Sequence, residues 1–233
     1  MKTNRKWLTL WLLAILSFPT ASEAQEKVEA KIGADLVSEY VWRGQNLGNA
    51  SIQPAVSVAY RGLSLNAWGS VGITSEDTKE FDLTLGYSHR GFSVSVTDYW
   101  FNTQPKYFEY DTHHTSHVFE AQLGYDFGFL AANWYTNIGG ADGVNKDGKR
   151  AYSSYVSLSA PFNLGGLEWS GQIGATPWAT SFYASAGGFA VCEVSLKASK
   201  ELRMSNHFSI PVFAKAIWNP ASEDAHLVVG MSF

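Results

Sequence analysis

The chain has 233 residues, of which 15% are aromatic and 16% charged, and its formal net charge is −4 at pH 7. An acidic balance argues against nucleic acid as a partner, because phosphates attract basic surfaces. The single cysteine, Cys192, excludes an internal disulfide.

The N-terminal segment has the composition of a secretory signal peptide. A basic start precedes an apolar run over residues 7–18, and small residues precede an expected cleavage site after Ala24. The run is too short for the ~20 residues that a spanning helix needs, which leaves a helical anchor as the weaker alternative. We expect residues 1–24 to be removed after export and residues 25–233 to form one domain.

Apolar and polar residues then alternate with a period of two, in blocks of about ten residues, the length of a transmembrane strand. In chain order the blocks cover residues 31–43, 51–61, 62–73, 79–90, 91–101, 115–127, 128–138, 150–161, 166–175, 186–198, 207–218 and 225–233. No segment after the signal peptide has the unbroken apolar length of a spanning helix. The sequence therefore predicts an all-β fold, a single antiparallel transmembrane β-barrel of twelve strands.

The connections between blocks differ in length according to their position in the chain. After the even-numbered blocks they are tight, as at Arg61-Gly62, Arg90-Gly91, Phe127-Gly128 and residues 163–165. After the odd-numbered blocks they are longer and polar, and the last of these covers residues 219–225. This pattern predicts short periplasmic turns and longer extracellular loops. The tenth connection, near residues 199–207, is longer than the pattern predicts.

Aromatic residues cluster toward the ends of the blocks, where rings with polar tips suit the headgroup level of a membrane. Those expected there are Tyr40, Trp42, Tyr60, Tyr87, Tyr125 and Trp218. One block departs from the pattern, because Asp98 continues the apolar face of residues 92–96. Either a β-bulge or a position at the outer rim would reconcile a carboxylate with that face.

The opposite face of the alternation carries charges that would project into the barrel. They are Asp35, Glu39, Arg43, Asp82, Glu120, Glu193, Lys197 and Lys215. Charges of both signs in a water-filled bore create a transverse field and a modest ion selectivity. The alternative is that they pair across a narrow lumen and seal it. Twelve strands lie between filled barrels of about eight and open channels of about sixteen, so we expect a narrow pore.

The opening of the barrel resembles that of the TorF-type family of bacterial outer-membrane porins. The resemblance covers about residues 34–72 and rests on Ser38, Tyr40, Trp42, Arg43, Gly44, Pro54, Ala55, Trp68 and Ser70. It implies a porin architecture and brings no catalytic residues. The remainder of the chain is similar only in its regular succession of strands and in its last residue, Phe233.

Two other functions stay open. Asp111, His113, His114, Ser116 and His117 share one loop, and such residues could form an outer-membrane hydrolase or a metal site. A solvated polar loop is the simpler interpretation, and the sequence lacks the motif of outer-membrane phospholipases. The third alternative is a sealed barrel with a structural or adhesive role.

The final residue, Phe233, stays in phase with the apolar face of the last block. A terminal aromatic in that position predicts a C-terminal insertion signal read by the barrel-assembly machinery. We therefore expect a monomer in the bacterial outer membrane, in contact with lipid and lipopolysaccharide. It would let small polar solutes diffuse, without catalytic residues, metal or cofactor.

Overall fold

The computed structural model describes residues 27–74, 77, 79–101, 106–110, 115–183, 187–206 and 208–233. The predicted signal peptide, residues 1–24, lies outside these ranges. Within them, none of the chain forms a helix with the length and apolar character needed to cross a membrane.

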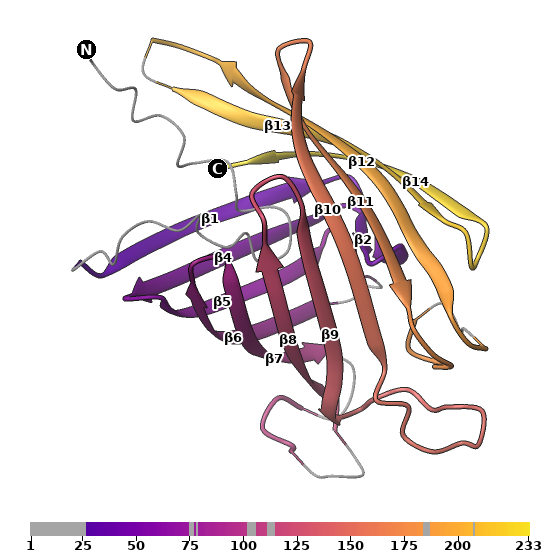
Figure 1. Cartoon of the computed structure of the whole chain (residues 1–233). Coiled ribbons are helices and arrows are strands. Elements are labelled where there is room, and N and C mark those ends of the chain that lie inside the picture. The colour runs from indigo at the N-terminus through magenta and orange to yellow at the C-terminus, as the bar shows by residue number, and fades with distance from the viewer. Residues whose placement is uncertain are drawn as a thin grey trace.

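Twelve antiparallel strands form a closed barrel, each bonded to its neighbours in the wall, and the first closes on the last (Figure 1). The wall strands are β1 (Glu29–Val37), β4 (Ser51–Tyr60), β5 (Leu63–Gly72), β6 (Lys79–His89), β7 (Phe92–Phe101), β8 (His117–Asp126), β9 (Ala131–Gly140), β10 (Ser154–Leu164), β11 (Leu167–Thr176), β12 (Ala190–Arg203), β13 (Ser209–Asn219) and β14 (Asp224–Ser232). A two-stranded hairpin of β2 (Tyr40–Trp42) and β3 (Gln45–Gly48) stands apart from this wall. The predicted all-β barrel of twelve strands is confirmed.

The barrel closes along a short seam between β1 and β14. Leu36 lies opposite Met231 there, within three paired positions of the ladder. The backbones of Ala34 and Phe233 exchange two further hydrogen bonds, of 2.9 and 3.2 Å. Phe233 therefore takes part in closure, and its role as an insertion signal stays a prediction.

Engineered cysteines should cross-link this seam. Opposite residues in an antiparallel pair have Cα atoms about 5.5 Å or less apart, within the reach of a disulfide. Leu36→Cys with Met231→Cys should therefore form a disulfide upon oxidation of the folded protein, visible as a shift on a non-reducing gel. Leu36→Cys with Val229→Cys is the control, because Val229 lies two residues from Met231 on the same face of β14. Equal cross-linking of both pairs would contradict this closure.

Tight turns join the wall strands at one end, called here the turn end, and longer connections join them at the other, the loop end. Arg61 and Gly62 have φ angles of 50° and 86°, and the same pair of residues at 90 and 91 has 50° and 84°. Positive φ at both central residues is what a two-residue type I′ hairpin requires. These turns lie where the sequence predicts them.

Two connections differ from prediction. β12 continues to Arg203, so only residues 204–208 join it to β13, and the tenth connection is short after all. The β13–β14 connection, expected to be long, covers only residues 220–223 because both flanking strands pair as far as Asn219 and Asp224.

The two faces of the wall have opposite character. Outward side chains are mostly apolar and exposed, and Ile32 is 82% exposed. Inward side chains include many buried polar groups; on β7 alone these are Ser93, Ser95 and Thr97. Because a closed ladder leaves no strand edge unpaired, a wall of this kind satisfies its backbone without water. Tyr60, Tyr87, Tyr125 and Trp218 are exposed on the apolar outer face, as predicted.

The prediction of the first strand, residues 31–43, is wrong for its second half. β1 ends at Val37 instead of continuing to residue 43, and the chain then leaves the wall as the β2–β3 hairpin. Tyr40 and Trp42, expected in the outer aromatic belt, instead pack against interior rings. The cause is the turn at Arg43 and Gly44, where φ is 51° and 77°, the same two-residue turn geometry that joins wall strands elsewhere.

Candidate functional site

The hairpin of residues 40–48, called here the lumen hairpin, lies inside the barrel near the loop end. Its partners come from strands around the whole wall, which places it across the bore. The Tyr40 ring lies 5.6 Å from that of Trp68 on β5, and its hydroxyl donates to Glu80 on β6 at 2.9 Å. From the far side, the Asn219 side chain of β13 donates to the Gly44 carbonyl at 3.0 Å.

Arg43, at the tip of the lumen hairpin, forms a fully buried ion pair with Glu120 of β8. The contact is bidentate, with Nη1 2.5 Å from Oε2 and Nη2 2.8 Å from Oε1. Nη1 also donates to the Tyr183 hydroxyl, which lies in the β11–β12 connection. Burial raises the pKa of the Tyr183 phenol, so its hydroxyl stays protonated. The bidentate contact between Arg43 and Glu120 is the strongest geometry in which a guanidinium and a carboxylate can pair.

Aromatic rings surround the same guanidinium. Its central carbon lies 4.3 Å from the Trp42 ring, 4.1 Å from Tyr135, 4.8 Å from Tyr155 and 5.5 Å from Tyr183. All four are within the ~6 Å at which a ring face attracts a cation. Together with Glu120 they form the Arg43 cage, an anionic and aromatic site in the centre of the bore.

A second buried network lies beside the cage. Glu193 of β12 is fully buried and accepts hydrogen bonds from Tyr155 at 2.9 Å, Ser195 at 2.7 Å and Lys215 at 2.8 Å. Lys197 lies directly opposite Lys215, and its amine is 4.4 Å from the Phe213 ring. Attraction of Lys197 to this ring and of Lys215 to Glu193 offsets the repulsion between the two amines.

All eight predicted interior charges lie on the inner side of the wall or on the chain that folds inward. Asp35 is buried on β1, opposite Gln53. Glu39 lies at the entrance to the lumen hairpin, with an oxygen 2.9 Å from His226. Asp82 is buried on β6, two residues from Glu80. Their role in lining a pore stays a prediction.

Several interior residues lie outside the predicted set. Glu80 is in phase with Asp82, so the alternation itself could have identified it. Tyr99, Tyr135 and Tyr155 also follow the inward phase of their strands, and all three are buried. Tyr183 follows no strand alternation, and no signal in the sequence places it in the bore.

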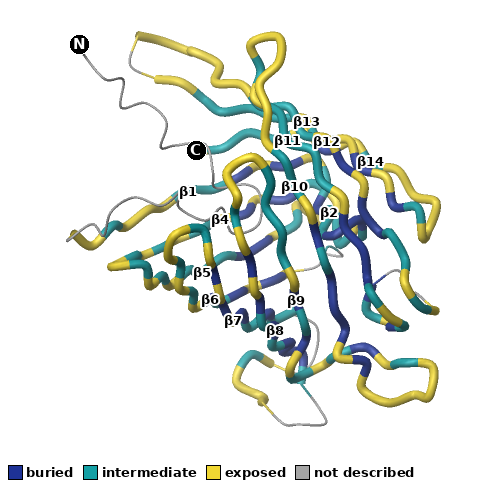
Figure 2. The backbone as a smooth tube through the Cα atoms, viewed as in Figure 1, coloured by how far each residue is buried: buried dark blue, intermediate teal, exposed yellow. Residues whose placement is uncertain are grey.

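Burial varies along the bore (Figure 2). In the loop-end half the inward side chains are buried, as at Glu80, Glu120 and Glu193. Toward the turn end they become half-buried, as at Ser57, Asn66 and Asn133. The lumen hairpin and its polar partners therefore occupy the most buried part of the bore.

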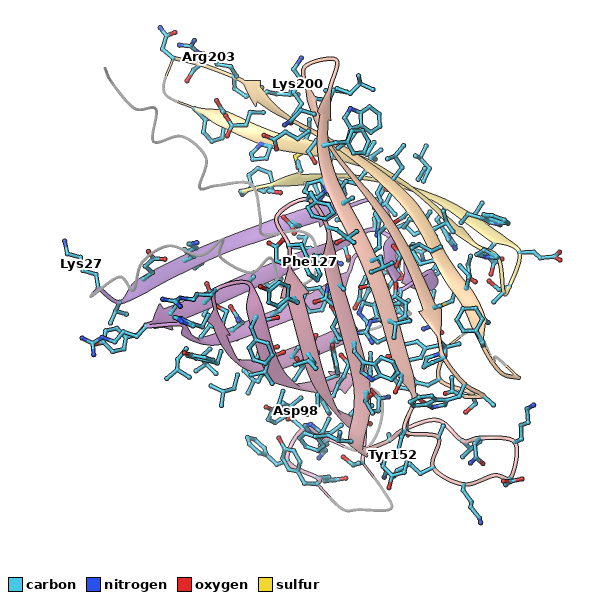
Figure 3. The ribbon with its side chains drawn as sticks, viewed as in Figure 1. Lys27, Asp98, Phe127, Tyr152, Lys200 and Arg203 are labelled. Atoms are coloured by element: carbon cyan, nitrogen blue, oxygen red, sulfur yellow. The ribbon has the colours of Figure 1, made fainter. Side chains whose placement is uncertain are left out.

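On the outer face, Asp98 lies toward the loop end of β7 (Figure 3). His117 faces it, with Nδ1 2.7 Å from its carboxylate, and Nε2 is 2.5 Å from the Tyr107 carbonyl. Both strand pairings of β7 keep register through this point, which favours the rim position over a bulge.

This contact also bears on the predicted hydrolase loop. A carbonyl only accepts hydrogen bonds, so Nε2 of His117 is the donor in this contact, and the ring is held between Asp98 and the Tyr107 carbonyl. Asp111, His113 and His114 lie outside the described residues. Among the residues that the structure describes, no cluster of three or more His, Cys, Asp or Glu side chains is arranged to hold a metal ion.

Comparison with known proteins gave one kind of match. No family model matches the chain. No curated protein matches it either. Among solved structures it is similar to a porin refined at 1.8 Å resolution, with 15% sequence identity and a TM-score of 0.36. The match covers 78% of this chain, which spans about three fifths (61%) of the length of that porin chain.

Proposed function

We propose that the chain is a porin-like channel of the bacterial outer membrane through which small polar solutes or ions diffuse. The observation that carries the proposal is the closed wall, apolar and exposed outside and polar and charged inside. Exposed apolar surface on this scale is unstable in water and stable in lipid. The resemblance of residues 34–72 to TorF-type porins supports the same proposal.

The orientation follows from the connections. In outer-membrane barrels the short turns face the periplasm and the long loops face outward. The turn end is therefore periplasmic, reached after export directed by residues 1–24, and both β1 and β14 have their free ends there. In this proposal Phe233 is read by the barrel-assembly machinery, and the chain works as a monomer among lipid and lipopolysaccharide.

Selection would occur at the lumen hairpin, without turnover or cofactor. Of the interior charged side chains described above, six are carboxylates (Asp35, Glu39, Glu80, Asp82, Glu120, Glu193) and three are basic (Arg43, Lys197, Lys215). An excess of carboxylates lowers the energy of cations in a narrow bore. The channel is therefore expected to prefer cations.

Planar-bilayer recording tests both the pore and its selectivity. The refolded protein should give unitary steps whose reversal potential in a salt gradient indicates cation preference. Glu80→Gln with Asp82→Asn should move the reversal potential toward zero, because it removes two carboxylates from the narrow region. Asp98→Asn, the same kind of change on the outer face, should leave it unchanged.

A sealed barrel is the second candidate, and the burial of the loop-end side chains favours it. In that case the whole chain would give no unitary steps. Such a result would overturn the channel and leave a structural or adhesive role for the loops.

A further inference from the structure

The chemistry of the Arg43 cage is that of a binding site whose ligand is supplied by the chain itself. A buried carboxylate and four aromatic rings converge on one guanidinium, and that guanidinium stands on a hairpin inside the bore. We propose that the cage recognises guanidinium-bearing solutes, and that Arg43 occupies it as a tethered internal ligand. The inference rests on the proposed channel for its biological use, whereas binding itself does not require conduction.

The carboxylate of Glu120 stays oriented without Arg43. Its Oε1 accepts a hydrogen bond from Tyr99 at 2.9 Å, and its Oε2 accepts one from Tyr183 at 3.1 Å. Both hydroxyls come from outside the lumen hairpin, so the site is organised by groups that remain when the hairpin moves. A preorganised acceptor loses little entropy on binding, which favours a small ligand.

The geometry selects guanidinium over other cations. A planar fork of N–H donors matches the two oxygens of Glu120, which an ammonium cannot do as a single point charge. Tyr135 and Tyr155 of the wall, and Tyr183 of the β11–β12 connection, present rings to the same cation. Three of the four rings therefore stay in place for a ligand that replaces Arg43, and only Trp42 belongs to the hairpin.

Arg43 fits the cage incompletely, which leaves it open to displacement. Its Nε is buried and has no hydrogen-bond partner among the described residues. Its backbone has a positive φ of 51°, a conformation that residues other than glycine rarely adopt. A free guanidinium has neither constraint, but it must compete with a tethered group of high effective concentration.

Binding of methylguanidinium to the refolded full chain tests the inference, with calorimetry at constant ionic strength as the readout. Arg43→Ala removes the competitor, so binding should become on the order of tenfold tighter or more than in the unmodified protein. Arg61→Ala is the matched control, since Arg61 occupies the same Arg-Gly turn position at the periplasmic end, with φ of 50°. It should bind as weakly as the unmodified protein.

A second substitution identifies the site. Arg43→Ala combined with Glu120→Gln should lose the gain in binding, because the amide offers only one acceptor to the fork. If Arg43→Ala does not refold, Arg43→Lys decides, since lysine cannot chelate Glu120 and should be displaced by less methylguanidinium than arginine is. Tetramethylammonium binding as tightly as methylguanidinium would overturn the assignment of ligand class.

The outcomes separate this inference from the proposed channel. Equal, weak binding to the unmodified protein and to both Arg43 variants overturns the cage as a recognition site, even if the barrel conducts. Tight binding to Arg43→Ala that Glu120→Gln removes supports the cage, even if no variant conducts and the channel is abandoned.

Discussion

Replacement of residues 39–49 by Asn-Gly is expected to raise the single-channel conductance several-fold. The barrel should survive the excision, because Val37 and Ser51 are already cross-strand partners at the point where the lumen hairpin leaves the wall. A two-residue Asn-Gly connection forms the type I′ turn that such a pair needs. Ser38 and Ala50 are retained, with their backbone bonds to β14 and to residue 73.

Water then replaces the hairpin in the loop-end half of the bore. Glu120 loses its ion pair with Arg43, but it becomes hydrated at the same time, so the penalty for an unpaired buried charge is largely avoided. Conductance equal to that of the unmodified protein, with folding confirmed by heat-modifiable migration on a gel, would show that the hairpin does not limit the pore.

A point substitution should reproduce part of this effect. A Cβ at Gly44 would lie 1.8 Å from the Cys192 carbonyl oxygen, and the φ of 77° already disfavours any side chain. Gly44→Ala should therefore displace the lumen hairpin from its position against β12 and increase the single-channel conductance. Gly128→Ala is the control, since Gly128 has a φ of 86° and no atom within 4 Å of the added Cβ. Gly128→Ala has the same unfavourable backbone conformation as Gly44→Ala, but its side chain collides with nothing.

Glu193→Ala is expected to destabilise the barrel by about 3–5 kcal/mol, the usual cost of removing one member of a buried ion pair. The substitution leaves Lys215 without its carboxylate and removes the acceptor for Tyr155 and Ser195. Urea unfolding in lipid vesicles, followed by tryptophan fluorescence, measures the loss.

The double substitution Glu193→Ala with Lys215→Met shows whether the charge is responsible. It removes the unpaired amine as well, so it should recover part of the lost free energy of unfolding. If the single substitution changes stability by less than about 1 kcal/mol, water already solvates this network and the lumen is open at Lys215.

The wall could be predicted from the sequence because lipid and lumen impose opposite chemistry on alternate residues. The prediction fails at residues 38–43, where the same alternation continues after the chain has left the wall. Tyr40 and Trp42 keep the apolar phase of Leu36, so periodicity alone cannot register the departure. An aromatic pair that packs inside the bore has the same pattern as one in the outer belt.

A usable signal was nevertheless present in the turn chemistry. Arg-Gly occurs at residues 43, 61 and 90, and in all three places both residues have positive φ. The second and third are recognised as hairpin turns from their position between blocks, and the first is the same turn at the end of a predicted strand. The cage itself could not be predicted, because Tyr135 and Tyr155, which are cross-strand partners, meet Tyr183 only through a folded connection and meet Arg43 only because the hairpin turns inward.

The short seam between β1 and β14 has a consequence for the order of assembly. The lumen hairpin follows β1 and is synthesised early, yet its anchors include Asn219 of β13 and, beside its entrance, His226 of β14. These partners exist in place only when the last strands have joined the first. The contacts of the hairpin with β5, β6 and β8 can form earlier, so the hairpin should reach its final position only as the barrel closes, which couples closure of the wall to filling of the bore.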